Sequence, residues 1–89
     1  MRYTTIYNGT KITAKFDGTS WGLFLDGPMV AADRPGFWGI TVLQATLPDG
    51  FDTRFLVSIR QGFFGTKCLL KVEGECIEMV PDIPSYDRT

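Results

Sequence analysis

Residues 51–80, FDTRFLVSIRQGFFGTKCLLKVEGECIEMV, decide the fold of this 89-residue chain. At the start of the stretch, side chains two residues apart share a face, and one face is largely apolar, the pattern of a half-buried strand. We predict three successive strands, at residues 51–60, 66–72 and 76–80. Their apolar faces need a partner layer, which the rest of the chain must supply. The predicted inward set of the first strand is Phe51, Thr53, Phe55, Val57 and Ile59.

The first quarter of the chain carries two hairpin signals. Asn8-Gly9 is typical of a type I′ turn, because both residues tolerate positive φ. Asp17-Gly18 turns the chain a second time. Gly22 has no side chain and predicts a bulge or a close packing approach within the strand that follows. The three strands of this predicted meander are residues 3–7, 10–16 and 19–25.

Residues 26–37 form the longest predicted connection, because prolines within it cannot donate to a ladder. We expect it to cross between sheet layers, and residues 29–33 are long enough for a single helical turn at most. Residues 38–47 return to β character with apolar residues on both faces. That pattern fits a central strand covered on two sides or an oligomer contact. A helix is the alternative there, but β-branched residues and the following Pro-Asp-Gly turn disfavour it.

The sequence therefore predicts an all-β fold, a small barrel or sandwich of about seven mostly antiparallel strands with little or no helix. The chain is too short to divide, so residues 1–84 form one domain and residues 85–89 a polar C-terminal tail. A composition of 44% hydrophobic and 13% aromatic residues excludes disorder. A domain this small cannot hide so many aromatic rings easily, so we expect a homo-oligomer.

The formal net charge of −1 provides no global attraction to nucleic acid or to an anionic membrane. No apolar run approaches the roughly 18 residues of a membrane span, and no signal-peptide pattern opens the chain. We expect a soluble cytoplasmic protein with no membrane partner. Cys68 and Cys76 flank a hairpin turn out of register for a disulfide, so both are interpreted as free thiols, with Cys68 buried.

The residues that usually perform catalysis are scarce. The chain has no histidine, which removes the commonest general base and metal ligand. The glycines of Gly62-Phe63-Phe64-Gly65 precede a strand, so they do not form a phosphate loop. The aspartates near loops are interpreted as turn residues that bond the local backbone, although two meeting in the fold could support acid chemistry. We expect no enzyme activity, no cofactor and no metal. These aspartates are Asp17, Asp26, Asp33, Asp49 and Asp52.

Basic residues occur in pairs on the outer faces of strands whose inner faces are apolar. If these strands share one sheet, they form a positive patch that could hold phosphates or an acidic partner. The alternative is that they keep the protein soluble and prevent edge-to-edge pairing. Phe63 and Phe64, at a predicted turn tip, could meet a partner or stack on a base, or could plug the end of a barrel. The pairs are Lys11 and Lys15, Arg54 and Arg60, and Lys67 and Lys71.

These features favour a small non-enzymatic binding or inhibitor protein, of the kind that phages and mobile elements encode, which engages a protein or a small anionic ligand. Two other classes stay open at this point. One is a small barrel that binds single-stranded nucleic acid through basic and aromatic side chains. The other is a structural assembly subunit that uses its surplus apolar surface.

Overall fold

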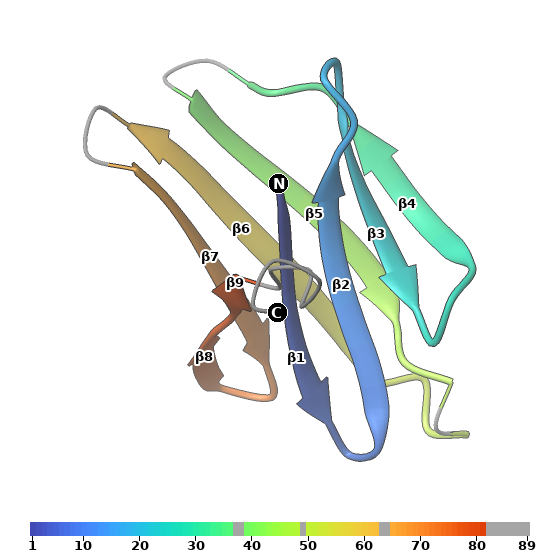
Figure 1. Cartoon of the computed structure of the whole chain (residues 1–89). Coiled ribbons are helices and arrows are strands. Elements are labelled where there is room, and N and C mark those ends of the chain that lie inside the picture. Colours follow the sequence, from blue (N-terminus) through green and yellow to red (C-terminus); the bar gives the residue numbers. More distant parts are fainter. Residues whose placement is uncertain (37–38, 49, 63–64, 82–89) are drawn as a thin grey trace, which may run out of the picture.

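The computed structural model describes residues 1–36, 39–48, 50–62 and 65–81. It is an all-β sandwich of two antiparallel sheets, with strand orders β4-β3-β2-β1-β9 and β5-β6-β7-β8. In Figure 1 the five-stranded sheet lies in front of the four-stranded sheet, and their strands cross obliquely. The strands are β1 (Arg2–Tyr7), β2 (Thr10–Phe16), β3 (Trp21–Leu25), β4 (Met29–Asp33), β5 (Ile40–Thr46), β6 (Arg54–Gly62), β7 (Gly65–Val72), β8 (Glu75–Glu78) and β9 (Val80–Pro81).

The predicted all-β class is confirmed. Of the two predicted forms, barrel and sandwich, the sandwich is correct, because the sheets do not close into a barrel. The predicted tail, residues 85–89, lies outside the described residues. Among the residues that are described, no helix is long and apolar enough to cross a membrane.

Two tight turns set the register of the hairpins. Asn8 and Gly9 both have positive φ, 50° and 79°, as the predicted turn requires. They join β1 to β2 with Tyr7 opposite Thr10. Glu73 and Gly74 repeat this geometry, with φ of 48° and 80°, between β7 and β8. Because the side-chain period is two, the register decides which side chains face the core.

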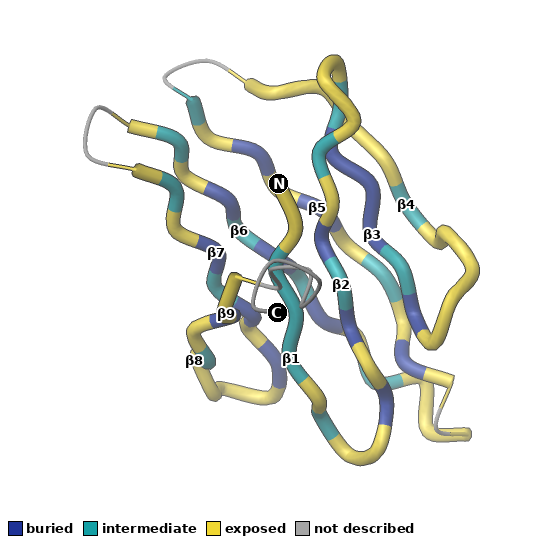
Figure 2. Tube along the Cα trace, viewed as in Figure 1, coloured by how far each residue is buried: buried dark blue, intermediate teal, exposed yellow. Residues whose placement is uncertain are grey.

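The core lies between the inner faces of the two sheets, where Figure 2 shows the buried segments. Trp21 is fully buried there between the rings of Phe16 and Tyr3, with centroids 5.2 and 6.4 Å from its own. Its Nε1 donates to Oε1 of Gln61, 3.3 Å away in the other sheet. Burial of each aliphatic side chain contributes roughly 1.5–3 kcal/mol. The remaining core residues are Ile12, Ala14, Leu23, Leu25, Leu43, Leu47, Phe55, Val57, Ile59, Cys68, Leu70, Val72 and Met79.

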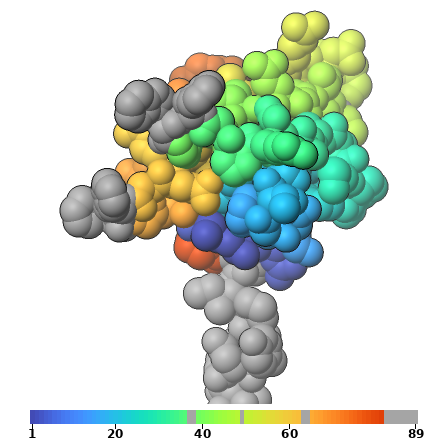
Figure 3. Space-filling view, turned by 90° about the horizontal axis from the view of Figure 1, so that it is seen from above, coloured from blue at the N-terminus to red at the C-terminus, as the bar shows by residue number. Residues whose placement is uncertain are grey.

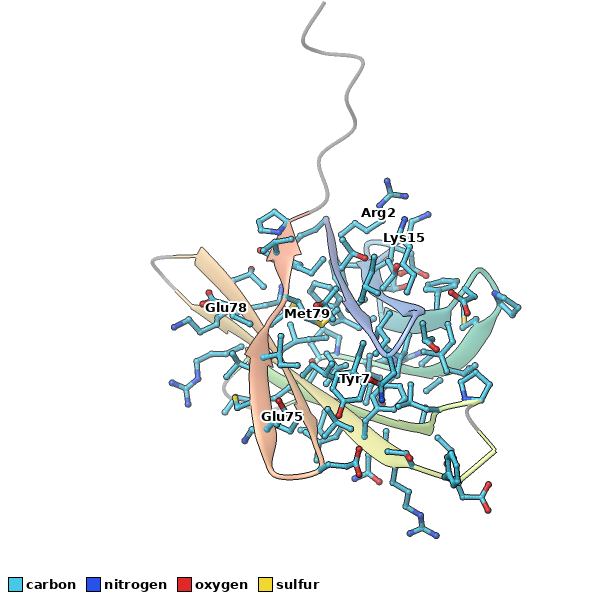
Figure 4. The ribbon with its side chains drawn as sticks, turned by 90° about the horizontal axis from the view of Figure 1, so that it is seen from below. Arg2, Tyr7, Lys15, Glu75, Glu78 and Met79 are labelled. Atoms are coloured by element: carbon cyan, nitrogen blue, oxygen red, sulfur yellow. The ribbon has the colours of Figure 1, made fainter. Side chains whose placement is uncertain are left out.

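The two sheets are linked at opposite sides of the sandwich. On one side the chain leaves β4 and crosses to β5, as predicted for this connection. Figure 3 looks onto the end where the start of this crossing lies beside the β2–β3 turn. On the other side β8 runs into β9 through Met79, which is buried between them (Figure 4). The Met79 N–H donates to the Cys68 carbonyl at 3.0 Å, and Val80 then pairs with Thr4 of β1. The predicted strand at residues 76–80 is therefore divided between the two sheets.

The prediction that residues 26–37 form one long connection is wrong. Residues 29–33 are strand β4, paired with β3, and not a helical turn. Asp26 has a φ of 51° and lies in a tight turn in which the Leu25 N–H donates to the Pro28 carbonyl at 3.0 Å. Pro28 lies outside the β-ladder, so its missing N–H costs no ladder hydrogen bond. This edge strand is exposed along most of its length, which is why no alternation marked it in the sequence.

Two predictions about side-chain faces are also wrong. Phe51 is 85% exposed instead of inward, because Asp52 takes a positive φ of 55° and the regular strand begins only at Arg54. Residues 40–46 form β5 at the edge of its sheet, so the interpretation as a central strand is wrong, whereas the alternative of an oligomer contact stays a prediction. Apolar Ile40 and Val42 therefore point to the outside of the sandwich, whereas Thr41 points into it.

Gly22 confirms the predicted close approach. A Cβ atom at this position would lie 3.0 Å from Cε1 of Phe24 and 3.4 Å from the Met29 methyl group. The β3–β4 register also shifts between Leu23 and Phe24, which is the irregularity that a strand glycine often marks. The ring of Phe24 thus leans over the position where a side chain is missing.

The two thiols differ as the sequence predicted. Cys68 is 1% exposed on the inner face of β7, and burial raises the pKa of its thiol to about 12. Cys76 is exposed on β8, opposite Lys71, and both thiols are free.

We expect an aromatic disulfide reagent at about pH 8 to modify one thiol per folded chain and two after denaturation, because only an accessible thiolate attacks a disulfide. Cys76→Ser should abolish the reaction of the folded protein, and Cys68→Ala should leave it intact. Rapid modification of both thiols in the folded chain would contradict the placement of Cys68 in the core.

Candidate functional site

The predicted basic residues lie on two opposite faces of the molecule. Lys11 and Lys15 are on β2 of the five-stranded sheet, whereas the other four are on β6 and β7 of the four-stranded sheet. All six are exposed, because the apolar set of each strand is buried between the sheets. The condition for one continuous patch, a shared sheet, is therefore not met. There are two candidate surfaces, one on the outer side of each sheet.

The first surface is the outer side of the four-stranded sheet, here called the β5–β8 face. Its residues form cross-strand rows, because antiparallel partners point to the same side. Arg60 of β6 lies opposite Lys67 of β7, and Leu56 lies opposite Lys71. The face consists of Ile40, Val42, Gln44 and Thr46 on β5, Arg54, Leu56, Ser58 and Arg60 on β6, Lys67, Leu69 and Lys71 on β7, and Cys76 and Glu78 on β8.

Three apolar side chains surround Ser58 in the middle of the β5–β8 face, and we call this group the apolar centre: Val42 and Leu69 lie directly opposite Ser58, and Leu56 lies two residues before it. Val42 is 44% exposed, and Leu56 and Leu69 are half-buried on the neighbouring strands. The cations lie on either side of the apolar centre along the strands, with Arg60 and Lys67 toward one end of the sheet and Arg54 toward the other.

The charges on the β5–β8 face are unbalanced. Arg60 and Lys67 are directly opposite, an arrangement that destabilises a sheet. Glu78 is the carboxylate that the described strands place on this face, opposite Leu69 and diagonal to both lysines. In the described part of the chain, none of the four cations forms an ion pair with a carboxylate. A hollow of about 180 Å³ lies between Arg54, Leu56 and Lys71.

The second surface is the outer side of the five-stranded sheet, which contains what we call the basic hollow, of about 290 Å³. Arg2 and Lys15 are direct cross-strand neighbours at its wall, and Figure 4 shows both projecting from this side. The Lys11 N–H donates to Oδ1 of Asp26 at 2.9 Å, which fixes the end of β2 next to the hollow. The hollow is lined by Arg2, Lys11, Thr13, Lys15, Phe24 and Gly27.

A neighbouring hollow of about 230 Å³, here called the aromatic hollow, shares Lys15 and Phe24 with the first. The ring of Phe24 and the methyl group of Met29 lie against Gly22 within it. Asp17 stands at its rim, where Oδ1 accepts hydrogen bonds from the Thr19 N–H, the Thr19 hydroxyl and the Ser20 N–H at 2.9 to 3.0 Å. These hydrogen bonds, the Ser20 one first, lower the pKa of the Asp17 carboxyl.

The sequence alone did not single out Arg2 or Phe24. One signal for Phe24 was present, because it stands two residues after Gly22 and therefore shares the face from which a side chain is missing. A signal for Arg2 was also present, because a two-residue turn at Asn8-Gly9 that places Tyr7 opposite Thr10 also places Arg2 opposite Lys15. Phe63 and Phe64 lie outside the described residues.

The aspartate prediction is confirmed for Asp17 and Asp33. Asp17 bonds its own turn, and Oδ1 of Asp33 accepts from the neighbouring Arg34 N–H at 2.8 Å. Asp26 instead bonds the backbone of a neighbouring strand, and Asp49 lies outside the described residues. Within the described ranges, no three side chains of the metal-binding types gather in one place.

Outside the β5–β8 face, exposed apolar side chains occur at several separate places. Ile6 on β1 is 70% exposed, Val80 on β9 58% and Met29 on β4 57%. Single exposed apolar residues are ordinary on protein surfaces. The expectation of a homo-oligomer therefore stays a prediction.

An acidic cluster lies at the end of the sandwich where two hairpin turns meet. The Tyr7 hydroxyl is 3.2 Å from Oε1 of Glu73 and 3.3 Å from Oε2 of Glu75, so it can donate to either carboxylate. Figure 4 shows Tyr7 and Glu75 on the same side of the molecule. Partial burial of the phenol, followed by the two negative charges, raises the pKa of Tyr7 above 10.0.

Comparison of the chain with protein families, with curated proteins and with solved structures found no match.

We expect Tyr7 to form its phenolate at higher pH than an unperturbed tyrosine. Ultraviolet difference spectra recorded during a pH titration should show a phenolate transition above pH 10.0 in the native protein that is missing in Tyr7→Phe. The folded state holds the Tyr7 proton more tightly than the unfolded state, so the protonated phenol stabilises the fold below pH 10.0. This stabilisation disappears as pH rises through the pKa of Tyr7 in the folded state. Glu73→Gln with Glu75→Gln should lower the transition part of the way, since burial remains. A transition at or below that of free tyrosine would contradict the contact.

Proposed function

We propose that this chain is a small non-enzymatic binding protein and that the β5–β8 face binds an acidic segment of another protein. The observation that carries the proposal is the combination on one face of a partly exposed apolar centre and four cations without carboxylate partners in the described structure. An interface typically has an apolar core and a polar rim, and this face has that arrangement.

The acidic character of the partner follows from the charges. Four cations against one carboxylate give the described face an excess of three positive charges. Arg60 and Lys67 repel each other in the free protein, so a carboxylate placed between them relieves an unfavourable contact. Such charge complementarity also raises the rate of association.

The hollow beside Leu56 gives the partner a defined position. A glutamate or aspartate side chain that enters it comes within reach of both Arg54 and Lys71, which line its walls. A guanidinium can donate two parallel hydrogen bonds to a carboxylate, whereas an ammonium acts as a point charge. Apolar residues of the partner next to that acid would cover Val42 and Leu69.

The area of the β5–β8 face indicates which class of complex it can form. Four strands about 4.8 Å apart, with the seven residues of β5 at about 3.4 Å each, cover roughly 450 Å². The total area buried on both partners would therefore be roughly 900 Å², which is typical of weak and transient complexes. We infer a transient regulatory or inhibitory contact, in preference to a permanent assembly.

We expect the protein to bind immobilised poly-L-glutamate in biolayer interferometry, with affinity that falls as salt screens the exposed charges. The double substitution Arg54→Ser, Arg60→Ser should weaken binding roughly tenfold or more, because charge-assisted hydrogen bonds contribute about 1.5–3 kcal/mol each. Its melting temperature should stay close to that of the native protein, since both side chains are exposed.

The matched control removes the same number of charges from the opposite face. Lys11→Ser with Lys15→Ser should reduce binding to poly-L-glutamate much less than the Arg54 and Arg60 pair does. Equal losses from the two pairs would mean that net charge and not the β5–β8 face governs binding, and the proposal would be abandoned. An acidic peptide that contains leucine should bind more tightly than poly-L-glutamate of equal charge, because it also covers the apolar centre.

A further inference from the structure

The outer side of the five-stranded sheet carries a second feature, which the proposed function does not use. The basic hollow and the aromatic hollow lie next to each other, and the ring of Phe24 and the side chain of Lys15 line both. One hollow is lined by cations and the other mainly by apolar groups. A ligand that fills both must therefore have an anionic end and a flat apolar end.

We propose that the two hollows together bind a nucleotide unit, with its phosphate in the basic hollow and its base against the ring of Phe24 in the aromatic hollow. The shared chemistry is a phosphate joined to a planar heterocycle. A free nucleotide and a nucleotide within a single strand both supply it.

The phosphate position follows from the lining of the basic hollow. Lys11 and Lys15 lie on the same face of β2 with Thr13 between them, so both ammonium groups and a hydroxyl point to the same side. Arg2 adds a guanidinium directly opposite Lys15. No carboxylate lines this hollow within the described residues. Phosphate oxygens accept hydrogen bonds from groups of all three kinds.

The base position follows from the packing around Gly22. The Phe24 ring occupies the space left by the absent side chain, 3.0 Å from where a Cβ would be, and in this position it lines the aromatic hollow. The Met29 methyl group borders the same space, so the hollow offers one aromatic surface and one flexible apolar surface. Bases stack on aromatic side chains with little dependence on sequence.

Asp17 adds a polar contact at the rim of the aromatic hollow. Its Oδ1 accepts the three hydrogen bonds from Thr19 and Ser20, and the carboxylate has acceptor sites beyond these three. An ionised carboxylate accepts hydrogen bonds but cannot donate them. The edge of the base that meets Asp17 must therefore carry an N–H group, such as the exocyclic amine of adenine.

The proposal is tested by NMR titration of the ¹⁵N-labelled protein with adenosine monophosphate. The amides of β2 and β3 should shift and saturate, whereas those of β6 and β7 should not. Ribose 5-phosphate, which lacks the base, and adenosine, which lacks the phosphate, should each bind at least tenfold more weakly. If ribose 5-phosphate binds as tightly as the nucleotide, or if the shifts fall on β6 and β7, the proposal is wrong.

Substitutions separate the two halves of the ligand. Lys11→Ser with Lys15→Ser should weaken nucleotide binding at least tenfold. Phe24→Leu, which keeps an apolar side chain, should weaken the binding of adenosine monophosphate roughly tenfold but hardly change the binding of ribose 5-phosphate. Arg54→Ser with Arg60→Ser is the matched control and should leave nucleotide binding unchanged. If both charge pairs weaken binding equally, the site is not the two hollows. Melting curves show whether each variant is folded before its binding is interpreted.

The two sources of the nucleotide are distinguished by a ten-residue adenine oligonucleotide. If a single strand is the natural ligand, the oligonucleotide binds much more tightly than the monophosphate, and the logarithm of its affinity falls linearly with that of the salt concentration. If a free nucleotide is the ligand, the oligonucleotide gains nothing over the monophosphate. The failure of this proposal leaves the β5–β8 face untouched, because each face has its own probe and its own pair of substitutions.

Discussion

The structure depends on the burial of alternate side chains between two sheets. Ile12 and Leu23 of one sheet and Val57, Ile59 and Leu70 of the other have no exposed surface at all. Because the side-chain period of a strand is two, holding these residues inside forces their neighbours outside. The exposure of every basic strand residue is therefore a consequence of the core, and a register slip of one residue would both expose the core and bury the charges.

The same constraint explains why the protein offers two surfaces and not one. Each sheet has only its outer side available, and the two outer sides face in opposite directions. Both faces are hollowed: the hollow beside Leu56 lies on the β5–β8 face, and the basic and aromatic hollows lie on the other. The ring of Phe24 lies against Gly22 on that second face, because Gly22 has no side chain of its own. We therefore propose a different ligand for each face.

Several parts of the fold could be predicted because their cause is local. The turn at Asn8-Gly9 needs two residues that tolerate positive φ, and the alternation within β2, β6 and β7 follows from burial on one side. The parts that could not be predicted have a nonlocal cause. β4 is an exposed edge strand with no alternation, and its existence depends on pairing with β3. The period of two predicted that Phe51 points inward, but Asp52 has a positive φ, so the regular alternation starts only after it, at Arg54.

The sequence by itself determined the all-β class, the hairpin turns, the inward set of most strands and the separate states of the two thiols, because each depends on neighbours along the chain. It also placed six basic residues on outer faces. Only the tertiary structure decided that Lys11 and Lys15 belong to one sheet and Arg54, Arg60 and the two other lysines to the opposite one. The physical reason is that strand periodicity fixes whether a side chain points in or out, whereas the choice of sheet depends on which strands pair and where the chain crosses between layers.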